Sequence, residues 1–453
     1  MSDTNPAEHE AHVRDPLGEQ PRTVQLELPD LDGGLRAKLV SAKKAFSATG
    51  AAMCTILFGL TVADDVYESP VSSAANGYPD LVAMPDMATL RTLPWARSTA
   101  AVICDLYDAD GALFPVAPRS VLRRVIERVD AMGFEARVAA EWEFCVLHRD
   151  DEVIADGRHG ELRALGRTRN AYSSLRLTEL RPLSEDFLDR MGAVGIDIES
   201  MHTELGDGML EIAIAHAPAL DAVDAAVRAK TYLKELCGER DLIATFMSRW
   251  RPGAPTSGCH FHQSLWRDGV NAFAGPDGLS ELGRHYLAGQ LETMRELAVI
   301  FNPTINAYRR LQPGNFTPAT ASWGVDNRTA AIRLILGPAK SVRLEHRRPG
   351  ADVNPYLAVA AMVAGGMYGI EQELALPAAA VGDAFTDPGF ATLPTSLAAA
   401  IKAFETSNLA CELLGSEFVE HYSLSRRIEL DLWERWQSDQ VTEWEHHRYL
   451  ERS

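Results

Sequence analysis

Short stretches in which apolar and polar residues alternate recur along the chain and predict β-strands. The clearest is A-A-E-W-E-F-C-V-L, from Ala139 to Leu147. Successive side chains of a strand point to opposite faces, so Glu141 and Glu143 share one face while Trp142 and Phe144 lie on the other. Carboxylates are seldom buried unless they are paired or bind a cation. This pair of acids therefore marks either a solvated strand face or a ligand site.

Three later stretches place ligand-type residues at alternate positions of a predicted strand in the same way. They are Met209–Ala215 with Glu211, which follows Glu204 across a glycine-rich turn, Ser257–Leu265 with His260 and His262, and Ser341–Arg347 with Arg343, Glu345 and Arg347. Four strands of this kind indicate one shared site.

A second spacing, with apolar residues three and four positions apart, predicts helices. These cover 118–133, Leu220–Leu236, Leu279–Phe301, Pro355–Leu374 and Ser423–Leu450. Residues 22–115 instead mix short strands, such as Val24–Leu28, with Pro and Gly turns. Residues 1–21 are acidic and polar without periodicity. We therefore predict a disordered tail over 1–21, a β-rich domain over 22–115 and a larger domain of alternating strands and helices over 116–453.

Composition narrows the class of protein. The chain has 453 residues, is 46% hydrophobic and 24% charged, and carries a formal net charge of −19. This acidic balance argues against general affinity for nucleic acid or for an anionic membrane. The six cysteines form no C-x-x-C pair, which indicates neither a disulfide framework nor a thiolate zinc site and fits reduced thiols in a cytoplasm. Neither a signal peptide nor a run of about 18 apolar residues, as a membrane span requires, is recognisable.

The acids and the histidine on these strands match the ligand preference of hard divalent cations. Such cations bind oxygen ligands, and manganese also tolerates an imidazole. The candidate ligands are Glu141, Glu143, Glu204, Glu211, His260 and Glu345. A set this rich in acids and free of cysteine does not fit structural zinc. Two magnesium or manganese ions held together predict a phosphate ligand, whose oxygens they bridge and neutralise.

An arginine-dense stretch could supply cations for the same chemistry. It holds Arg309, Arg310, Arg328, Arg333, Lys340, Arg343, Arg347 and Arg348. A guanidinium offers a bidentate fork to carboxylate and phosphate oxygens. Such a run can also be a solvated face, but its position among turns and an alternating strand favours binding. The chain has no P-loop, kinase glycine loop or G-x-G-x-x-G, so any nucleotide must bind by other means.

Six motifs follow one another in the part of the chain after the tail. They are E-W-E at 141, H-T-E-L-G-D-G-M-L-E from His202, S-G-C-H-F-H-Q-S-L at 257, N-A-Y-R-R-L-Q-P-G from Asn306, D-N-R-T-A-A-I-R from Asp326, and K-S-V-R-L-E-H-R leading into N-P-Y-L-A at 354. This ordered set resembles the glutamine synthetase family. The resemblance implies an α+β fold, with an N-terminal β-grasp domain and a catalytic domain whose curved, largely antiparallel sheet is backed by helices. It also implies a homo-oligomeric ring, commonly a dodecamer, with active sites between subunits.

Matched residue by residue, the family pattern implies a role for each candidate. Glu143, Glu204 and Glu211 would hold one metal and Glu141, His260 and Glu345 a second, with two to three Mg²⁺ or Mn²⁺ ions in each site. His262, Ser264, Lys340 and Arg343 match ATP-site positions, Arg310 and Arg347 those that grip glutamate, and Arg328 and Arg333 those that stabilise the transferring phosphate. Asp30, in the turn Pro29–Lys38, matches the aspartate with which a neighbouring subunit binds and deprotonates ammonium. Turn chemistry alone also explains an acid at this position.

One departure from the family pattern bears on the substrate. Ammonia-using members carry an acid in the flap after R-L-x-P-G, where this chain has Phe316. An ammonium pocket needs negative charge, whereas an aromatic ring favours a substituted amine. The resemblance thus implies an ATP-dependent ligase that joins the γ-carboxylate of L-glutamate to a polyamine or a monoamine through γ-glutamyl phosphate. The alternatives are an ammonia-using glutamine synthetase, a catalytically silent sensor and a kinase-like enzyme for another carboxylate.

Overall fold

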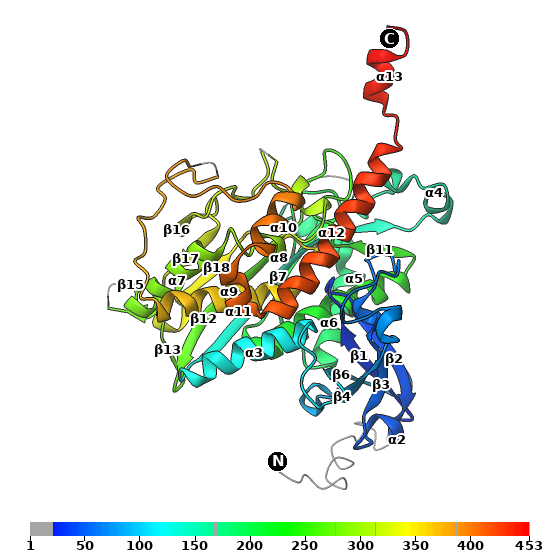
Figure 1. Cartoon of the computed structure of the whole chain (residues 1–453). Coiled ribbons are helices and arrows are strands. Elements are labelled where there is room, and N and C mark those ends of the chain that lie inside the picture. The colour runs from blue at the N-terminus through cyan, green and yellow to red at the C-terminus, as the bar shows by residue number, and fades with distance from the viewer. Residues whose placement is uncertain (1–20, 167–170, 277, 313, 386, 453) are drawn as a thin grey trace.

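The computed structural model describes residues 21–166, 171–276, 278–312, 314–385 and 387–452. The tail predicted over residues 1–21 lies outside this part of the chain except for Pro21. The described residues form a smaller N-terminal sheet and a larger sheet with helices packed on it (Figure 1).

The N-terminal sheet is built from short strands, with a four-residue α-helix and three short 3₁₀ helices between them. Its elements are β1 (Thr23–Pro29), β2 (Leu35–Ser41), α2 (Ala42–Ala45), β3 (Ala51–Cys54), β4 (Asp80–Pro85), β5 (Arg91–Thr92) and β6 (Thr99–Tyr107). The strand order is β2-β1-β6-β4-β3, with β5 paired to β6. The central pair β1 and β6 is parallel, and the other described pairs are antiparallel. The strand predicted at Val24–Leu28 is confirmed as part of β1.

The larger sheet contains the four strands whose alternation carries candidate ligands. Its strands are β7 (Glu135–His148), β8 (Ile198–Thr203), β9 (Met209–Ile214), β10 (Ala217–Pro218), β11 (Leu242–Thr245), β12 (Cys259–Arg267), β13 (Val270–Asn271), β16 (Trp323–Val325), β17 (Ile332–Ile335) and β18 (Arg343–His346), and a separate hairpin pairs β14 (Ala274–Gly275) with β15 (Gly278–Leu279). The order is β16-β17-β18-β12-β7-β9-β8. Within the described residues every pair along this order is antiparallel except β16 with β17. The four predicted strands are thus immediate neighbours, in the order β18-β12-β7-β9.

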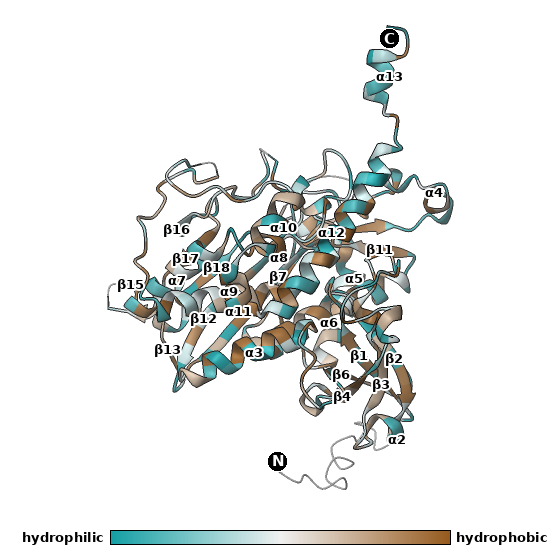
Figure 2. Ribbon diagram, viewed as in Figure 1, coloured by the Kyte–Doolittle hydropathy of each residue, from teal (hydrophilic) through white to brown (hydrophobic). Residues whose placement is uncertain are grey.

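Most of the helices that follow the N-terminal sheet pack on the apolar side of the larger sheet. The helices are α3 (Pro118–Ala131), α4 (Asp151–Ala155), α5 (Ser174–Ala193), α6 (Ala219–Gly238), α7 (Glu281–Thr293), α8 (Ala298–Phe301), α9 (Pro355–Glu371), α10 (Leu397–Glu405), α11 (Asn408–Leu414), α12 (Ser416–Ser438) and α13 (Glu443–Tyr449). Of these, α4 and α13 bury no residue, and α13 projects away from the sheet (Figure 1). Trp142 and Phe144 are fully buried, and the Trp142 indole donates to Ala226 O on α6 at 3.2 Å. Figure 2 shows apolar residues concentrated on α9 and polar ones along α13. The predicted division of β7 into an acid-bearing and an apolar face is confirmed.

Three of the predicted helices are confirmed as α3, α6 and α9, whereas two are corrected. The helix predicted over Leu279–Phe301 is two helices, because Leu279 pairs in β15 and the backbone after Thr293 forms three-residue turns, such as Ala298 N to Arg295 O at 3.3 Å. Apolar spacing continues through these turns, so periodicity alone could not locate the break.

The helix predicted over Ser423–Leu450 is also two helices, and the first starts earlier, at Ser416. Thr442 begins a new helix as its N-cap: its hydroxyl accepts from Glu445 N, and the Glu445 carboxylate accepts from Thr442 N. This capping box starts a separate helix, so the predicted continuous helix is interrupted before Thr442. Similarly, the strand predicted from Ser341 begins only at Arg343, because Ala339–Ser341 forms a 3₁₀ turn.

Charged side chains join the N-terminal sheet to the helices of the larger domain. Glu27 of β1 is fully buried and accepts from Arg228 and Tyr232 of α6, both at 2.7 Å. The predicted boundary between residues 115 and 116 falls between β6 and α3, and it stays a prediction. None of the helices in the described part of the chain is both long and apolar enough to cross a bilayer.

Candidate active site

The acid-bearing face of the larger sheet borders a cavity of about 750 Å³. The strand register brings the predicted residues together across neighbouring strands. Glu143 on β7 lies opposite Glu211 on β9, and His260 on β12 lies opposite Glu141 on β7. Like charges placed directly opposite each other destabilise a sheet unless something else balances them. The register therefore creates a site with an excess of negative charge.

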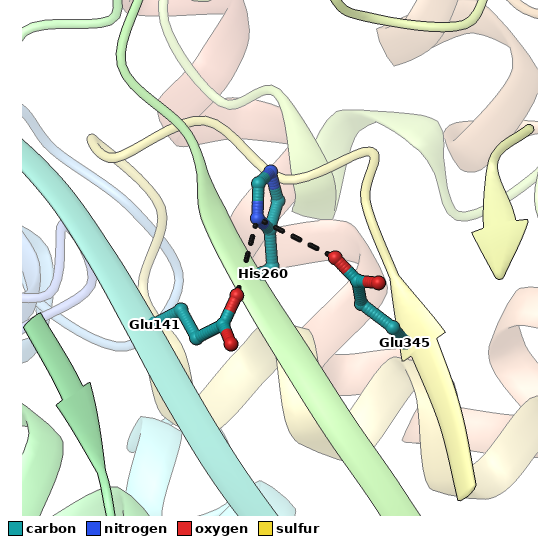
Figure 3. Close-up of side chains that lie close together, drawn as sticks. All are labelled: Glu141, His260 and Glu345. Atoms are coloured by element: carbon teal, nitrogen blue, oxygen red, sulfur yellow. Dashed lines mark ion pairs between the residues drawn. The ribbon is translucent and has the colours of Figure 1, made fainter. Parts of the chain in front are cut away.

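The six predicted metal ligands lie close enough together to share ions, and we call them the ligand cluster (Glu141, Glu143, Glu204, Glu211, His260 and Glu345). His260 Nδ1 lies 3.5 Å from Glu141 and 3.7 Å from Glu345, with the three side chains converging from three strands (Figure 3). A second possible ligand set joins Glu143 and Glu211 to His260, and a third joins Glu204 and Glu211 to His202. Carboxylates with an imidazole suit magnesium or manganese.

The pKa values of the acids in this cluster are shifted in opposite directions. Burial raises the pKa of Glu211, and the neighbouring acids, Glu141 foremost, raise it further to about 9. Burial also raises the pKa of Glu345, but Arg347 and His260 outweigh it and bring that pKa down to about 2. The raised pKa of Glu211 favours a protonated carboxyl at neutral pH, whereas the lowered pKa of Glu345 favours the carboxylate. Such a divided set of carboxylates is typical of a site that binds cations.

Four arginines predicted to bind substrate line the same cavity. Arg333 bridges Asp326 and Glu345, and Arg347 also pairs with Glu345. Arg310 is buried and donates to the carbonyls of Arg348 and Arg347 at 3.0 and 3.3 Å. Burial lowers the pKa of Arg310 to about 10, so it stays charged at neutral pH. Cationic and acidic groups therefore face each other across one space, as a negatively charged substrate bound to cations requires.

Gly258 allows Arg310 to reach this position. A Cβ at residue 258 would lie 2.4 Å from the Arg310 guanidinium, closer than real side chains approach. The amide of Gly258 also donates to the Glu143 carboxylate at 2.5 Å. The S-G-C-H motif thus places a residue without a side chain next to both an arginine and a candidate ligand.

A smaller cavity of about 250 Å³ lies beside the first, and Glu141 lines both. It holds all four residues predicted to contact ATP: His262, Ser264, Lys340 and Arg343. His262 Nε2 lies 2.8 Å from Glu141, and Arg343 Nε donates to His262 Nδ1 at 3.1 Å. The Arg343 guanidinium thereby fixes the ring that contacts the acid shared by both cavities.

Large apolar side chains gather at the mouth of the larger cavity. Phe316 is 61% exposed, Leu205 50% and Tyr172 75%, although all three line the cavity. The Tyr172 ring stacks on His202 with centroids 4.5 Å apart. Exposed aromatic and aliphatic groups around a charged cavity mark a binding surface for a partly apolar ligand.

Asp30 is the predicted residue that does not line either cavity. Its carboxylate accepts from Gly34 N at 2.7 Å and from Arg36 Nε at 2.8 Å, and its carbonyl accepts from Asn354. Burial raises the pKa of Asp30. Within its own chain Asp30 therefore stabilises a turn, and its role toward a neighbouring subunit stays a prediction.

Sequence reasoning missed several residues of the site, among them His202 and Arg249. His202 Nε2 lies 3.1 Å from Glu204 and 3.7 Å from Glu211, so it can hold both acids. His202 and Glu204 are two positions apart in H-T-E, the same alternate spacing that marked the other ligand residues, so the sequence could have identified His202. Arg249 lines the cavity and donates to Asn315 Oδ1 at 2.9 Å, beside Phe316, and no pattern in the sequence marked it.

Comparison with known proteins agrees with this geometry. The family described as "Glutamine synthetase, catalytic domain" matches residues 115–449. The chain is 39% identical over 435 residues to gamma-glutamylethanolamide synthetase GlnA4 of Streptomyces coelicolor, across 95% of this chain and 93% of the relative. It is 35% identical over 442 residues to glutamate–isopropylamine ligase of a Pseudomonas species, across 95% of each.

A solved structure is similar over the whole chain as well. The GmaS/ADP complex in its conformation 1 superimposes with a TM-score of 0.82 at 26% identity, covering 99% of this chain and 100% of the other. The resemblance predicted from the six motifs is confirmed, including the similarity to enzymes that form γ-glutamyl amides. The chain belongs to the glutamine synthetase family.

Proposed function

We propose that the protein is an ATP-dependent ligase that joins the γ-carboxylate of L-glutamate to an organic amine. The observation that carries this proposal is one cavity lined both by acids and arginines and by the exposed side chains of Phe316, Leu205 and Tyr172. The two relatives named above act, by their names, on glutamate with ethanolamine or isopropylamine, and the GmaS structure holds ADP.

The first step transfers the γ-phosphoryl group of ATP to a glutamate oxygen, giving γ-glutamyl phosphate and ADP. The ligand cluster would hold two to three Mg²⁺ or Mn²⁺ ions, which supply charge neutralisation for the phosphate oxygens when bound. Arg310 and Arg347 would bind the carboxylates of glutamate, and Arg328 and Arg333 would stabilise the transferring phosphate. Arg328 is exposed beside the cavity, so its guanidinium can move onto a ligand.

ATP would occupy the smaller cavity. His262, Ser264, Lys340 and Arg343 line it, and the shared Glu141 separates it from the glutamate side. This arrangement lets the terminal phosphate reach the larger cavity while the rest of the nucleotide stays in the smaller one. Arg343 and Lys340 supply the positive charge that phosphate requires.

In the second step the amine nitrogen attacks the acyl carbon of γ-glutamyl phosphate and phosphate leaves. The attacking nitrogen must lose a proton, and Asp30 of a neighbouring subunit is our candidate base. Because Asp30 pairs with Arg36 in its own turn, this role requires that pair to open or to shift. Replacing Asp30 by Asn should lower kcat by about 100-fold or more if it is the base. Unchanged kcat with lower stability would leave Asp30 a turn residue.

The identity of the amine substrate can be tested directly. Steady-state rates of ADP formation would be measured with glutamate, Mg²⁺ or Mn²⁺, and ammonia, ethanolamine, isopropylamine or a diamine. We expect organic amines to exceed ammonia in kcat/KM. Ammonia exceeding every amine would identify a glutamine synthetase, and absence of ATP turnover with every acceptor would identify a silent relative.

Three further expectations belong to the proposal. The parallel central pair of the N-terminal sheet supports a β-grasp domain over residues 22–115. A homo-oligomeric ring, commonly a dodecamer, would bring Asp30 to a neighbouring site. The six cysteines, all without a disulfide partner, support a cytoplasmic location.

A further inference from the structure

The segment Ala379–Phe385, which we call the strap, runs along the edge of the larger sheet. It belongs to the connection between α9 and α10 and passes beside β16, where Ala380 N donates to Trp323 O at 2.8 Å (Figure 1). Ala380 and Ala384 are buried against Ala330. The strap is therefore packed against the protein and held by main-chain hydrogen bonds.

The strap holds the loop that carries Arg328. Gly382 O accepts from Asn327 Nδ2 at 2.8 Å, and Ala384 N donates to Thr329 Oγ1 at 2.9 Å. These two hydrogen bonds hold Asn327 and Thr329, the residues directly before and after Arg328. Gly382 has a φ of +82°, a conformation that glycine adopts without strain.

The same strap also holds the flap Gly314–Pro318. Phe385 O accepts from Ala319 N at 3.0 Å, directly after the flap. The Phe385 ring meets Phe316 edge to face, with centroids 5.8 Å apart and an interplanar angle of 77°. Phe385 is half-buried and does not line the cavity, whereas Phe316 lines it and is 61% exposed. Phe385 thus supports the aromatic residue that faces the cavity.

We infer that Phe385 is a positioning residue for amine selection, acting through Phe316. An exposed phenylalanine on a loop samples several rotamers, and an edge-to-face partner restricts it. The fixed Phe316 ring then offers apolar contact to the carbon substituent of a primary amine, while ammonia gains nothing from it. The strap also holds the loop that carries Arg328. It therefore fixes the position of the Phe316 ring relative to the arginine proposed to bind the transferring phosphate. This inference rests on the proposed function and names the amine class: primary amines with a carbon chain long enough to reach Phe316.

The test compares n-butylamine with ammonia in wild type, Phe385→Ala, Phe385→Tyr and Phe390→Ala. Phe390 packs against the same buried alanines, but in the described part of the chain it makes no ring contact with Phe316, so it controls for loosening of the strap. Phe385→Ala should raise the KM for butylamine by about 3- to 10-fold, the value of an aromatic pair. The KM values for glutamate and ATP should stay unchanged. Phe385→Tyr keeps the ring, so its KM for butylamine should stay close to that of the wild type.

An unchanged ratio of butylamine to ammonia kcat/KM in Phe385→Ala, or an equal change in Phe390→Ala, would overturn the inference. Should Phe385→Ala fail to fold, Phe385→Leu keeps the apolar volume without the ring and gives the same ratio test. The preference of the wild type tests the proposed function separately: ammonia favoured over every amine by the wild type refutes that function. An amine-preferring wild type whose preference does not respond to residue 385 refutes only the positioning role.

Discussion

Two clusters of largely buried acidic side chains in the protein differ in how their charge is balanced. One is the balanced cluster (Asp86, Asp105, Asp224, Arg119 and Arg123), in which Arg119 lies 2.6 to 2.8 Å from each of the three acids. Burial raises the pKa of Asp86, but Arg119 and Arg123 outweigh it and the net shift is downward. The other is the ligand cluster, where Glu211 has four acids around it and a pKa raised to about 9.

The difference separates a structural role from a functional one. Buried acids paired with arginine need nothing from outside, and they join the N-terminal sheet to α3 and α6. Buried acids in excess are stable only if protons or cations make up the missing charge. The same residue types therefore join the N-terminal sheet to helices in one place and form a candidate metal site in the other.

The largest effect should come from breaking the balanced cluster. Replacing Arg119 by Met leaves three acids short of a cation and should destabilise the protein by about 3 to 5 kcal/mol. Thermal and denaturant unfolding would measure the loss. Arg128→Met is the matched control on the same helix, because its partner Glu371 is partly exposed and such pairs contribute at most about 1 kcal/mol. Equal losses in both variants would contradict the comparison.

In the ligand cluster, by contrast, replacing a charged residue should not lower the stability of the metal-free protein. Glu211→Gln removes a candidate ligand and should lower kcat/KM by at least about 100-fold. Because the substitution also relieves repulsion among acids, the metal-free variant should unfold at the same temperature as the wild type or higher. Glu185→Gln, at an exposed site on α5, serves as control. A metal-free Glu211→Gln that melts well below the wild type would show that Glu211 stabilises the fold.

The raised pKa of Glu211 predicts how metal binding depends on pH. An acid whose folded pKa lies near 9 keeps a proton that the unfolded chain loses near 4.5, so metal-free stability falls as pH rises through this window. A metal ion must displace that proton, and its affinity should rise by up to about 10-fold per pH unit below 9. The rise in Tm caused by Mn²⁺ should be larger at pH 8.5 than at pH 6.5. Glu211→Gln should weaken this dependence, and equal Tm shifts at both pH values would speak against it.

The smallest effect is expected at the edge of the ligand cluster. His202 contacts Glu204 and Glu211, and Tyr172 stacks on its ring. His202→Asn should raise the Mn²⁺ concentration for half-maximal activity by about 10-fold, as for residues that orient ligands. Tyr172→Leu should raise it less, because the imidazole remains. Metal titrations of activity would rank the two, and a larger effect from Tyr172→Leu would mean that the ring acts on substrate.

Much of the site could be predicted because it lies on strands. Alternation placed Glu141 with Glu143 on one face and Trp142 on the other, as the structure has them. The continuous helices predicted at Leu279–Phe301 and Ser423–Leu450 were wrong, because turns and a capping box interrupt helices without interrupting apolar spacing. The strap could not be predicted at all: its contacts join Phe385 to Phe316 and Gly382 to Asn327, pairs far apart in the chain.

The sequence by itself determined which side chains share a face, since the backbone stereochemistry of each residue sets the period of a strand or helix. It also determined the family, through motifs that keep their order. Only the tertiary structure decided that β12 lies between β7 and β18, with His260 opposite Glu141 and Glu143 opposite Glu211. Strand order and register depend on how distant segments pack together, and a local pattern carries no information about which segments those are.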